Sequence, residues 1–207
     1  MSIAPRRIQK PKKRVTQRRR GNTRSDNRRD ELLAAAARLF SKNGFEATSM
    51  RDIANEVGML AGSMYYHFPA KDDLIVAAHA EGVQELLRAM DAALEGVVGG
   101  WERLEAVCVT HLENLLGGSD IAGVVAVDFS QLPEELRARL IEQRDEYEGR
   151  LAQLIDALEL REGVDRRLVR LSLLGSLNWT PNWFRAEGQA PAAIARHFVA
   201  LLRDGVC

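Results

Sequence analysis

The segment from Ser49 to Phe68, SMRDIANEVGMLAGSMYYHF, most constrains the fold, because it contains two short helical patterns joined by a glycine turn. Its first half places apolar residues at i, i+3, i+4 and i+7 of a helix, namely Met50, Ile53, Ala54 and Val57. A helix this short is unstable alone in water, so it must pack against neighbouring helices. Ser49 and Asp52 have the spacing of a capping box, and Gly58 supplies the permissive backbone that ends the helix.

The second half of this segment predicts a helix with one buried side and one small, hydroxyl-rich side. Leu60, Met64 and Phe68 recur at i, i+4 and i+8, which leaves Gly62, Ser63, Tyr65 and Tyr66 pointing elsewhere. Small residues allow a close approach to base edges, and hydroxyls can donate to phosphates, so the pattern indicates a DNA-binding helix-turn-helix. The alternative is a plain helical hairpin with an exposed tyrosine pair.

From Arg28 to Leu74 the chain resembles the DNA-binding domain of the TetR family of bacterial repressors, through LLAAAARLFSKNGFEATSMRDIANEVG and GSMYYHFPAKDDL. The resemblance implies a three-helix helix-turn-helix domain at residues 26–86. It assigns Ala61, Gly62, Ser63 and Tyr65 to the groove-facing helix, and Ser49, Tyr66, His67 and Lys71 to phosphate or neighbouring contacts. Leu60 and Ala70 depart from the family pattern, because each stands where a capping serine is usual and so forgoes about 1 kcal/mol.

The net charge of zero conceals a separation of charge along the chain. Residues 1–25 contain ten Lys or Arg and no acid, whereas the remainder has 19 Lys or Arg and 29 Asp or Glu. We expect residues 1–25 to form a disordered basic arm that binds nucleic acid, because they have no apolar face to bury. A solubility tail and an arm that binds anionic lipid are the alternatives.

The sequence also argues against several classes of protein. It has no apolar run long enough for a membrane span and no secretory signal, so we expect a cytoplasmic protein without a membrane partner. Cys108 and Cys207 lack the spacing of a disulfide framework or a metal site. No catalytic motif such as GxSxG, a phosphate-binding loop or HExxH is present, so we expect neither an enzyme nor a cofactor.

The rest of the chain reads as helices, which makes the expected fold all-α. We expect helices from Ser25 or Asp26 to residue 43, and at residues 72–95, 101–116, 133–160, 165–179 and 191–203. Residues 87–207 should form a larger helical domain for ligand binding and dimerisation. The last two helices are apolar over most of their circumference, and Ser172, Gly175 and Ser176 form a ridge of small residues. These features favour a homodimer interface over burial within one subunit.

The segment from Gly175 to Phe184, GSLNWTPNWF, is similar to one found in TetR-family regulators of fatty-acid, sterol and other acyl-CoA catabolism. This resemblance suggests a CoA thioester as inducer, near Asn178, Trp179, Trp183 and Arg185. Apolar and polar residues that could line the acyl cavity are Met90, Cys108, His111 and Phe129. The alternatives are that the tryptophans only bury the dimer interface and that the other residues only fill the core.

The function that these features predict is a repressor that binds a palindromic double-stranded operator as a homodimer. A small-molecule inducer, for which the resemblance suggests an acyl-CoA, would release it. The main alternative is a ligand-free DNA-binding factor of the same fold that acts on the nucleoid or in cell division.

Overall fold

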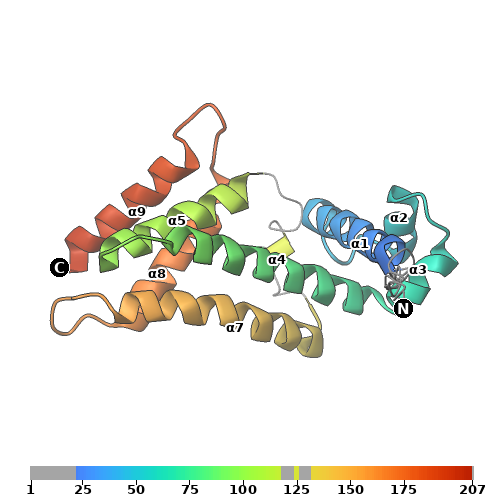
Figure 1. Cartoon of the computed structure of the whole chain (residues 1–207), viewed down its shortest axis with the longest axis horizontal. Coiled ribbons are helices and arrows are strands. Elements are labelled where there is room, and N and C mark those ends of the chain that lie inside the picture. Colours follow the sequence, from blue (N-terminus) through green and yellow to red (C-terminus); the bar gives the residue numbers. More distant parts are fainter. Residues whose placement is uncertain (1–21, 118–123, 126–131, 207) are drawn as a thin grey trace, which may run out of the picture.

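The computed structural model describes residues 22–117, 124–125 and 132–206, and within them every element is helical (Figure 1). The elements are α1 (Asn22–Asn43), α2 (Met50–Glu56), α3 (Ala61–His67), α4 (Lys71–Leu94), α5 (Gly100–Leu116), α7 (Glu134–Asp156), α8 (Arg166–Trp179), the 3-10 helix η1 (Thr180–Asn182) and α9 (Pro191–Val206). The molecule is elongated, with α1–α3 at one end. We call α1–α3 the head and the helices beyond it the body. The predicted all-α fold is confirmed.

One apolar core holds the head together. Side chains from all three head helices and from the start of α4 are fully buried in it: Leu32, Phe40, Ile53, Met64 and Leu74. Because α2 and α3 have only seven residues each, their positions depend on this burial rather than on helix propensity.

α7 contributes to the head core as well as to the body. Leu136 and Leu140 in its first half lie in the same buried cluster as the head residues. Leu151 and Ile155 in its second half belong to the body cluster, together with residues of α4, α5, α8 and α9. α7 therefore joins the two cores.

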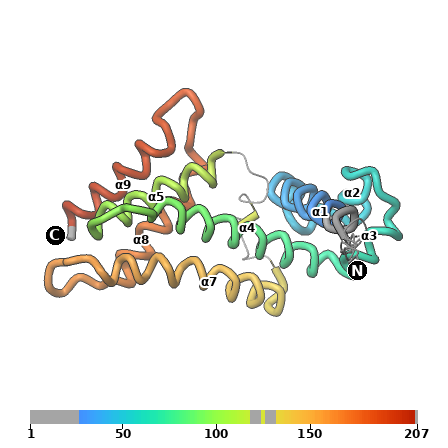
Figure 2. The backbone as a smooth tube through the Cα atoms, viewed as in Figure 1, coloured from blue at the N-terminus to red at the C-terminus, as the bar shows by residue number. Residues whose placement is uncertain are grey.

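α4 and α7 lie side by side along the molecule (Figure 2) and are linked by polar contacts as well as by packing. His79 Nδ1 is 2.8 Å from Gln143 Oε1, and Arg150 donates to Asp91 at 2.7 Å. Exposed ion pairs such as the second contribute at most about 1 kcal/mol, so apolar burial must supply most of the attachment.

The structure corrects the predicted boundaries of three helices. α1 begins at Asn22, so Ser25 and Asp26 lie within it rather than capping it. α7 begins after Pro133 and ends at Asp156, before the predicted end at residue 160. The guanidinium of Arg166 explains this early end, because it donates to the carbonyl oxygens of Ile155 at 2.5 Å and of Leu158 at 2.9 Å. The last helix continues to Val206, three residues beyond the prediction.

Substitution of one α7 leucine should separate the contribution of α7 to the head from its contribution to the body. Leu140→Ala removes a fully buried side chain from the head core, so we expect a loss of about 2–5 kcal/mol in the free energy of unfolding together with weaker DNA binding. Urea unfolding and an electrophoretic mobility shift measure the two effects.

Leu151→Ala is the matched control, because Leu151 is equally buried on the same helix but lies in the body core. It should cost similar stability and leave DNA affinity unchanged at temperatures where both variants are folded. Equal losses of DNA affinity in the two variants would contradict a specific link between α7 and the head.

Candidate DNA-binding surface and ligand cavity

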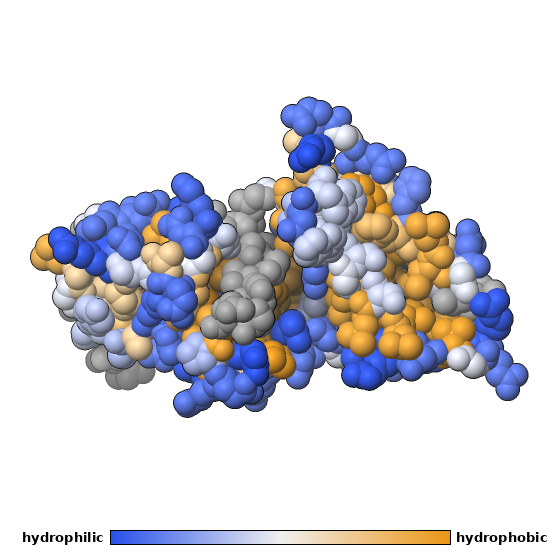
Figure 3. Space-filling model, turned by 180° about the vertical axis from the view of Figure 1, so that it is seen from behind, coloured by the Kyte–Doolittle hydropathy of each residue, from blue (hydrophilic) through white to orange (hydrophobic). Residues whose placement is uncertain are grey.

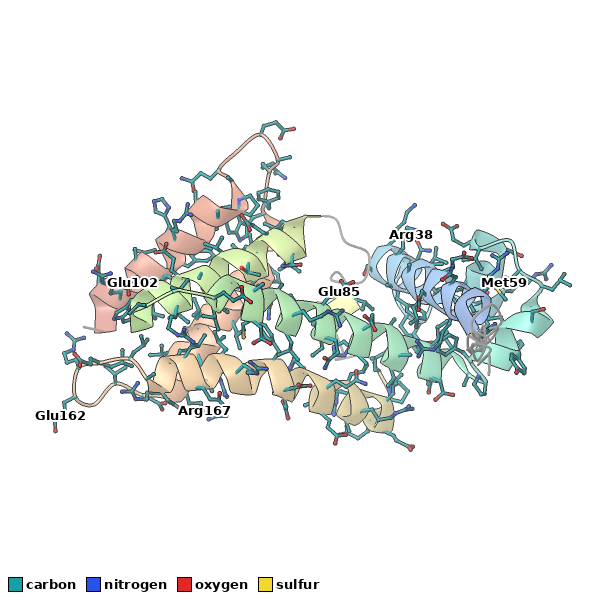
Figure 4. The ribbon with its side chains drawn as sticks, in the orientation of Figure 1. Arg38, Met59, Glu85, Glu102, Glu162 and Arg167 are labelled. Atoms are coloured by element: carbon teal, nitrogen blue, oxygen red, sulfur yellow. The ribbon has the colours of Figure 1, made fainter. Side chains whose placement is uncertain are left out.

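The predicted capping box at the start of α2 is confirmed. Ser49 Oγ accepts a hydrogen bond from the backbone N–H of Asp52 at 3.2 Å, and Asp52 Oδ2 accepts from the backbone N–H of Ser49 at 2.9 Å. The Ser49 hydrogen bonds also lower the pKa of Asp52, because they stabilise its carboxylate form. Arg38 on α1, labelled in Figure 4, pairs with Glu56 at 3.1 Å and so ties the other end of α2 to α1.

α3 buries one side and exposes the other at the end of the molecule. Met64 is fully buried, whereas Tyr65 is 52% and Tyr66 is 86% exposed. Gly62 and Ser63 are also exposed, and a Cβ added at Gly62 would meet nothing within 4 Å. The result is a small, hydroxyl-bearing and aromatic surface that a DNA groove can approach.

Other residues predicted to contact DNA lie at the edge of this surface. Ala61 and His67 are half-buried, and the His67 ring contacts Tyr66 edge-on at a centroid distance of 5.6 Å. Leu60 and Ala70 make no side-chain cap, as the sequence predicted, and Leu60 is 81% exposed.

Lys71 has a structural contact that the sequence did not predict. Its Nζ donates to the Phe45 carbonyl at 2.9 Å and lies 4.1 Å from the centroid of the Phe45 ring. This contact attaches the start of α4 to the turn between α1 and α2. The ammonium group therefore positions the head, in addition to any phosphate contact.

The body contains a cavity of about 40 Å³ between α4, α5, α7 and α8. Its walls combine four leucine and valine side chains with five polar or charged ones: Leu86, His111, Leu115, Val125, Arg144, Tyr147, Glu148, Leu174 and Asn178. His111 and Tyr147 are buried, while Asn178 is exposed. The cavity thus extends from the body core towards the surface near α8.

Three polar side chains from three helices form a hydrogen-bonded chain in the cavity wall. His111 Nδ1 is 2.8 Å from the Tyr147 hydroxyl, and His111 Nε2 is 3.0 Å from Asn178 Oδ1. Because the amide oxygen of Asn178 can only accept, Nε2 carries the hydrogen and Nδ1 accepts from Tyr147. The chain links α5, α7 and α8.

Burial keeps this chain uncharged. It lowers the pKa of His111 to about 4 from the ordinary value of 6.5, although the hydrogen bond with Asn178 acts in the opposite direction. Burial also raises the pKa of the Tyr147 hydroxyl. The charged groups of the wall are Arg144 and Glu148, whose side chains pair at 2.8 Å.

The structure brings two of the predicted ligand residues, His111 and Asn178, to this cavity. Met90 and Cys108 are buried in the body core but do not line the cavity. Burial raises the pKa of the Cys108 thiol to about 12. Trp179 is exposed on the outside of α8.

Trp183 and Arg185 do not line this cavity either. The ring of Trp183 packs against the ring of Phe198, with 6.3 Å between the two centroids. Arg185 is exposed in the segment before α9. Phe129 lies outside the described residues. No group of three His, Cys, Asp or Glu side chains suited to a metal ion occurs in the described ranges.

The contribution of α7 to the cavity, above all Tyr147 and Arg144, was not predicted from the sequence. The buried positions of α7 are Leu136, Leu140, Tyr147, Leu151 and Ile155, so one tyrosine interrupts a stripe of aliphatic residues. A hydroxyl in such a stripe needs a hydrogen-bond partner in the core, so Tyr147 was the one feature of the sequence that could have indicated a polar site on α7.

Two family matches cover both parts of the chain. Residues 32–78 match the bacterial regulatory proteins of the tetR family, and residues 97–206 match the tetracyclin repressor-like C-terminal domain. The chain belongs to the TetR family of transcriptional regulators. None of its described helices has both the length and the apolarity needed to cross a membrane.

Curated relatives and a solved structure agree with this family. The fatty acid metabolism regulator protein of Bacillus subtilis is 26% identical over 182 residues, which cover 85% of this chain and 94% of the relative. The transcriptional repressor KstR2 of Mycobacterium tuberculosis is 25% identical and covers 87% and 94% of the two chains. A crystal structure of AibR with isovaleryl coenzyme A and operator DNA superposes with a TM-score of 0.74 at 25% identity, covering 84% and 97%.

Loss of the exposed side chain of Tyr65 should weaken operator binding without unfolding the TetR-family head. We expect Tyr65→Ala to lower affinity by about 1–3 kcal/mol if the ring contacts bases, because the side chain lies on the exposed face of α3. Lys71→Ala should also lower affinity, with some loss of stability since it breaks the contact with Phe45. Fluorescence anisotropy and thermal unfolding separate the two effects.

Lys42→Ala is the charge-matched control, because Lys42 is exposed in the last turn of α1 rather than on α3 or at the start of α4. It should change neither stability nor affinity appreciably. Unchanged DNA affinity in both Tyr65→Ala and Lys71→Ala would overturn the assignment of this surface.

The buried His111 should make stability depend on pH in a defined window. Between pH 6.5 and about 4 the unfolded chain binds a proton that folded His111 does not, so the free energy of unfolding falls as the pH falls, by up to about 3 kcal/mol. Urea unfolding at several pH values between 7 and 4.5 should show a steeper decline for the wild type than for His111→Gln. Parallel pH profiles would contradict a lowered pKa of His111.

Proposed function

We propose that the protein is a homodimeric repressor that binds a palindromic operator through α3 and is released by a CoA thioester. The observation that carries the proposal is that α8 has one side at the cavity and another side at the outer surface of the body. Leu174 and Asn178 on α8 line the cavity, while Leu168, Leu171 and Trp179 on the same helix are exposed. A ligand in the cavity can therefore alter the surface that pairs the two subunits.

The proposed dimer surface is the apolar face of α8 and α9. Figure 3 shows apolar residues gathered on this side of the body, and the exposed ones include Leu168, Leu171 and Leu201. Ser172, Gly175 and Ser176 are exposed on the same helix, which allows two α8 helices to approach closely. A contiguous apolar surface of this kind marks an interface in soluble proteins.

A dimer also explains how one short helix can select a site. Each α3 has only seven residues, so two copies on two half-sites supply the specificity that one cannot. In this proposal residues 1–25 are a basic arm that adds phosphate contacts, residues 26–86 read the operator, and residues 87–207 bind ligand and dimerise. Residues 1–21 lie outside the described part of the chain.

The ligand class is supported by the cavity and by the relatives. AibR has been solved with isovaleryl coenzyme A and operator DNA, and the Bacillus subtilis relative regulates fatty acid metabolism. An apolar cavity with a few polar groups suits an acyl group attached to a polar carrier. A ligand-free DNA-binding factor of the same fold would need no such cavity.

The proposal is tested by a mobility shift on the DNA upstream of the protein's own coding sequence. We expect the dimeric protein, verified by size-exclusion chromatography, to bind this DNA and to be released by CoA thioesters. The matching free acids and free CoA should not release it, because each has only half of the ligand. Release by hydrophobic cations alone would overturn the CoA proposal and indicate a drug-sensing regulator.

A further inference from the structure

We propose that the cavity selects a short acyl group whose thioester carbonyl oxygen binds at the amide nitrogen of Asn178. This inference rests on the proposed function and defines the acyl part of the inducer more narrowly. It follows from the size of the cavity, from the hydrogen-bonded chain in its wall and from the position of its mouth.

The size of the cavity limits the acyl chain. A volume of about 40 Å³ has room for roughly three water-sized groups, which corresponds to an acyl group of about three to five carbon atoms. Leu86, Leu115 and Leu174 from three helices limit it further. Leu86 and Leu174 are buried in the body core, so a longer chain would have to displace packed side chains.

The polar chain determines where a carbonyl can bind. His111 uses both ring nitrogens, one towards Tyr147 and the other towards Asn178 Oδ1. The amide nitrogen of Asn178 donates to none of the described residues, although the side chain lines the cavity. Because His111 holds the amide oxygen, this nitrogen is fixed in place as a donor for a ligand oxygen.

The position of Asn178 matches the place of a thioester in such a ligand. His111 at the inner wall is buried, whereas Asn178 is exposed and Arg144 has a side chain that is 40% exposed. An acyl group inside the cavity would therefore place its carbonyl near Asn178 and its CoA part outside, past Arg144. The guanidinium of Arg144 would then face the anionic part of the carrier.

The chain-length inference is tested with the full-length protein on its upstream DNA, titrated with acetyl-, propionyl-, isobutyryl-, isovaleryl-, octanoyl- and palmitoyl-CoA. We expect release at the lowest concentration by the three- to five-carbon thioesters and at about tenfold or higher concentration by the two longest. Release chiefly by octanoyl- or palmitoyl-CoA would overturn the size inference and leave the proposed function standing. Release by no thioester would overturn the proposed function.

Two neighbouring leucines on α4 provide a matched pair of variants. Leu86→Ala enlarges the cavity and should shift the preferred acyl chain to a greater length, because Leu86 lines it. Leu87→Ala removes an equally buried leucine that does not line the cavity, so it should leave the preferred length unchanged. Identical length preferences in the two variants would contradict the proposed site. If Leu86→Ala fails to bind DNA, Leu115→Ala opens the same cavity from α5.

The carbonyl contact is tested with S-alkyl-CoA thioethers, which keep the chain and the CoA but lack the carbonyl oxygen. For half-release of the wild type, the thioether concentration should be about fivefold or more above the thioester concentration, because the thioether lacks one hydrogen bond. Asn178→Leu should remove this difference. Thr180→Val, which loses a buried hydroxyl at the end of α8 outside the cavity, should retain it. A difference that persists in Asn178→Leu would overturn the role of Asn178.

Discussion

The burial of two seven-residue helices in a shared core is the constraint on which the rest of the structure depends. α2 and α3 contribute Ile53 and Met64 to this core, and neither helix has enough hydrogen bonds to be stable in isolation. The DNA-binding surface exists only because α1, α4 and the first half of α7 cover its inner side. A TetR-family head is therefore sensitive to events in the body that move α4 or α7.

This arrangement gives a physical basis for coupling ligand to DNA. Tyr147 lines the cavity, Gln143 contacts His79 on α4, and Leu140 packs in the head core, all within two turns of α7. A shift of α7 at the cavity would change all three contacts together, because packed cores have discrete arrangements rather than a continuous range. To convert the protein from 99% to 1% DNA-competent, a ligand must favour the released form by about 5.5 kcal/mol. Tight binding alone does not meet this requirement.

The sequence predicted local features of the head well because its signals are local. The capping box at Ser49, the turn at Gly58 with its positive φ of 64° and the missing caps at Leu60 and Ala70 can each be read from a few neighbouring residues. The cavity could not be read in this way, because its wall joins residues of α4, α5, α7 and α8 that are far apart in the chain. The predicted end of α7 was wrong for the same reason, because the helix ends early through Arg166, which lies ten residues after its last residue.

The polar chain of Tyr147, His111 and Asn178 also determines how sharply such a cavity can discriminate between ligands. A purely apolar cavity distinguishes ligands that differ by one methylene by only about 1–3 kcal/mol, whereas a site with fixed hydrogen-bond donors rejects a ligand that leaves them unpaired more strongly. In the present wall, His111 is neutral and has both nitrogens occupied, so it holds Asn178 in one orientation. Any ligand that displaces Asn178 would also leave a buried His111 nitrogen without its partner, which costs about 1–3 kcal/mol. Ligands that accept from Asn178 without breaking its bond to His111 are therefore favoured over those that only fill the space.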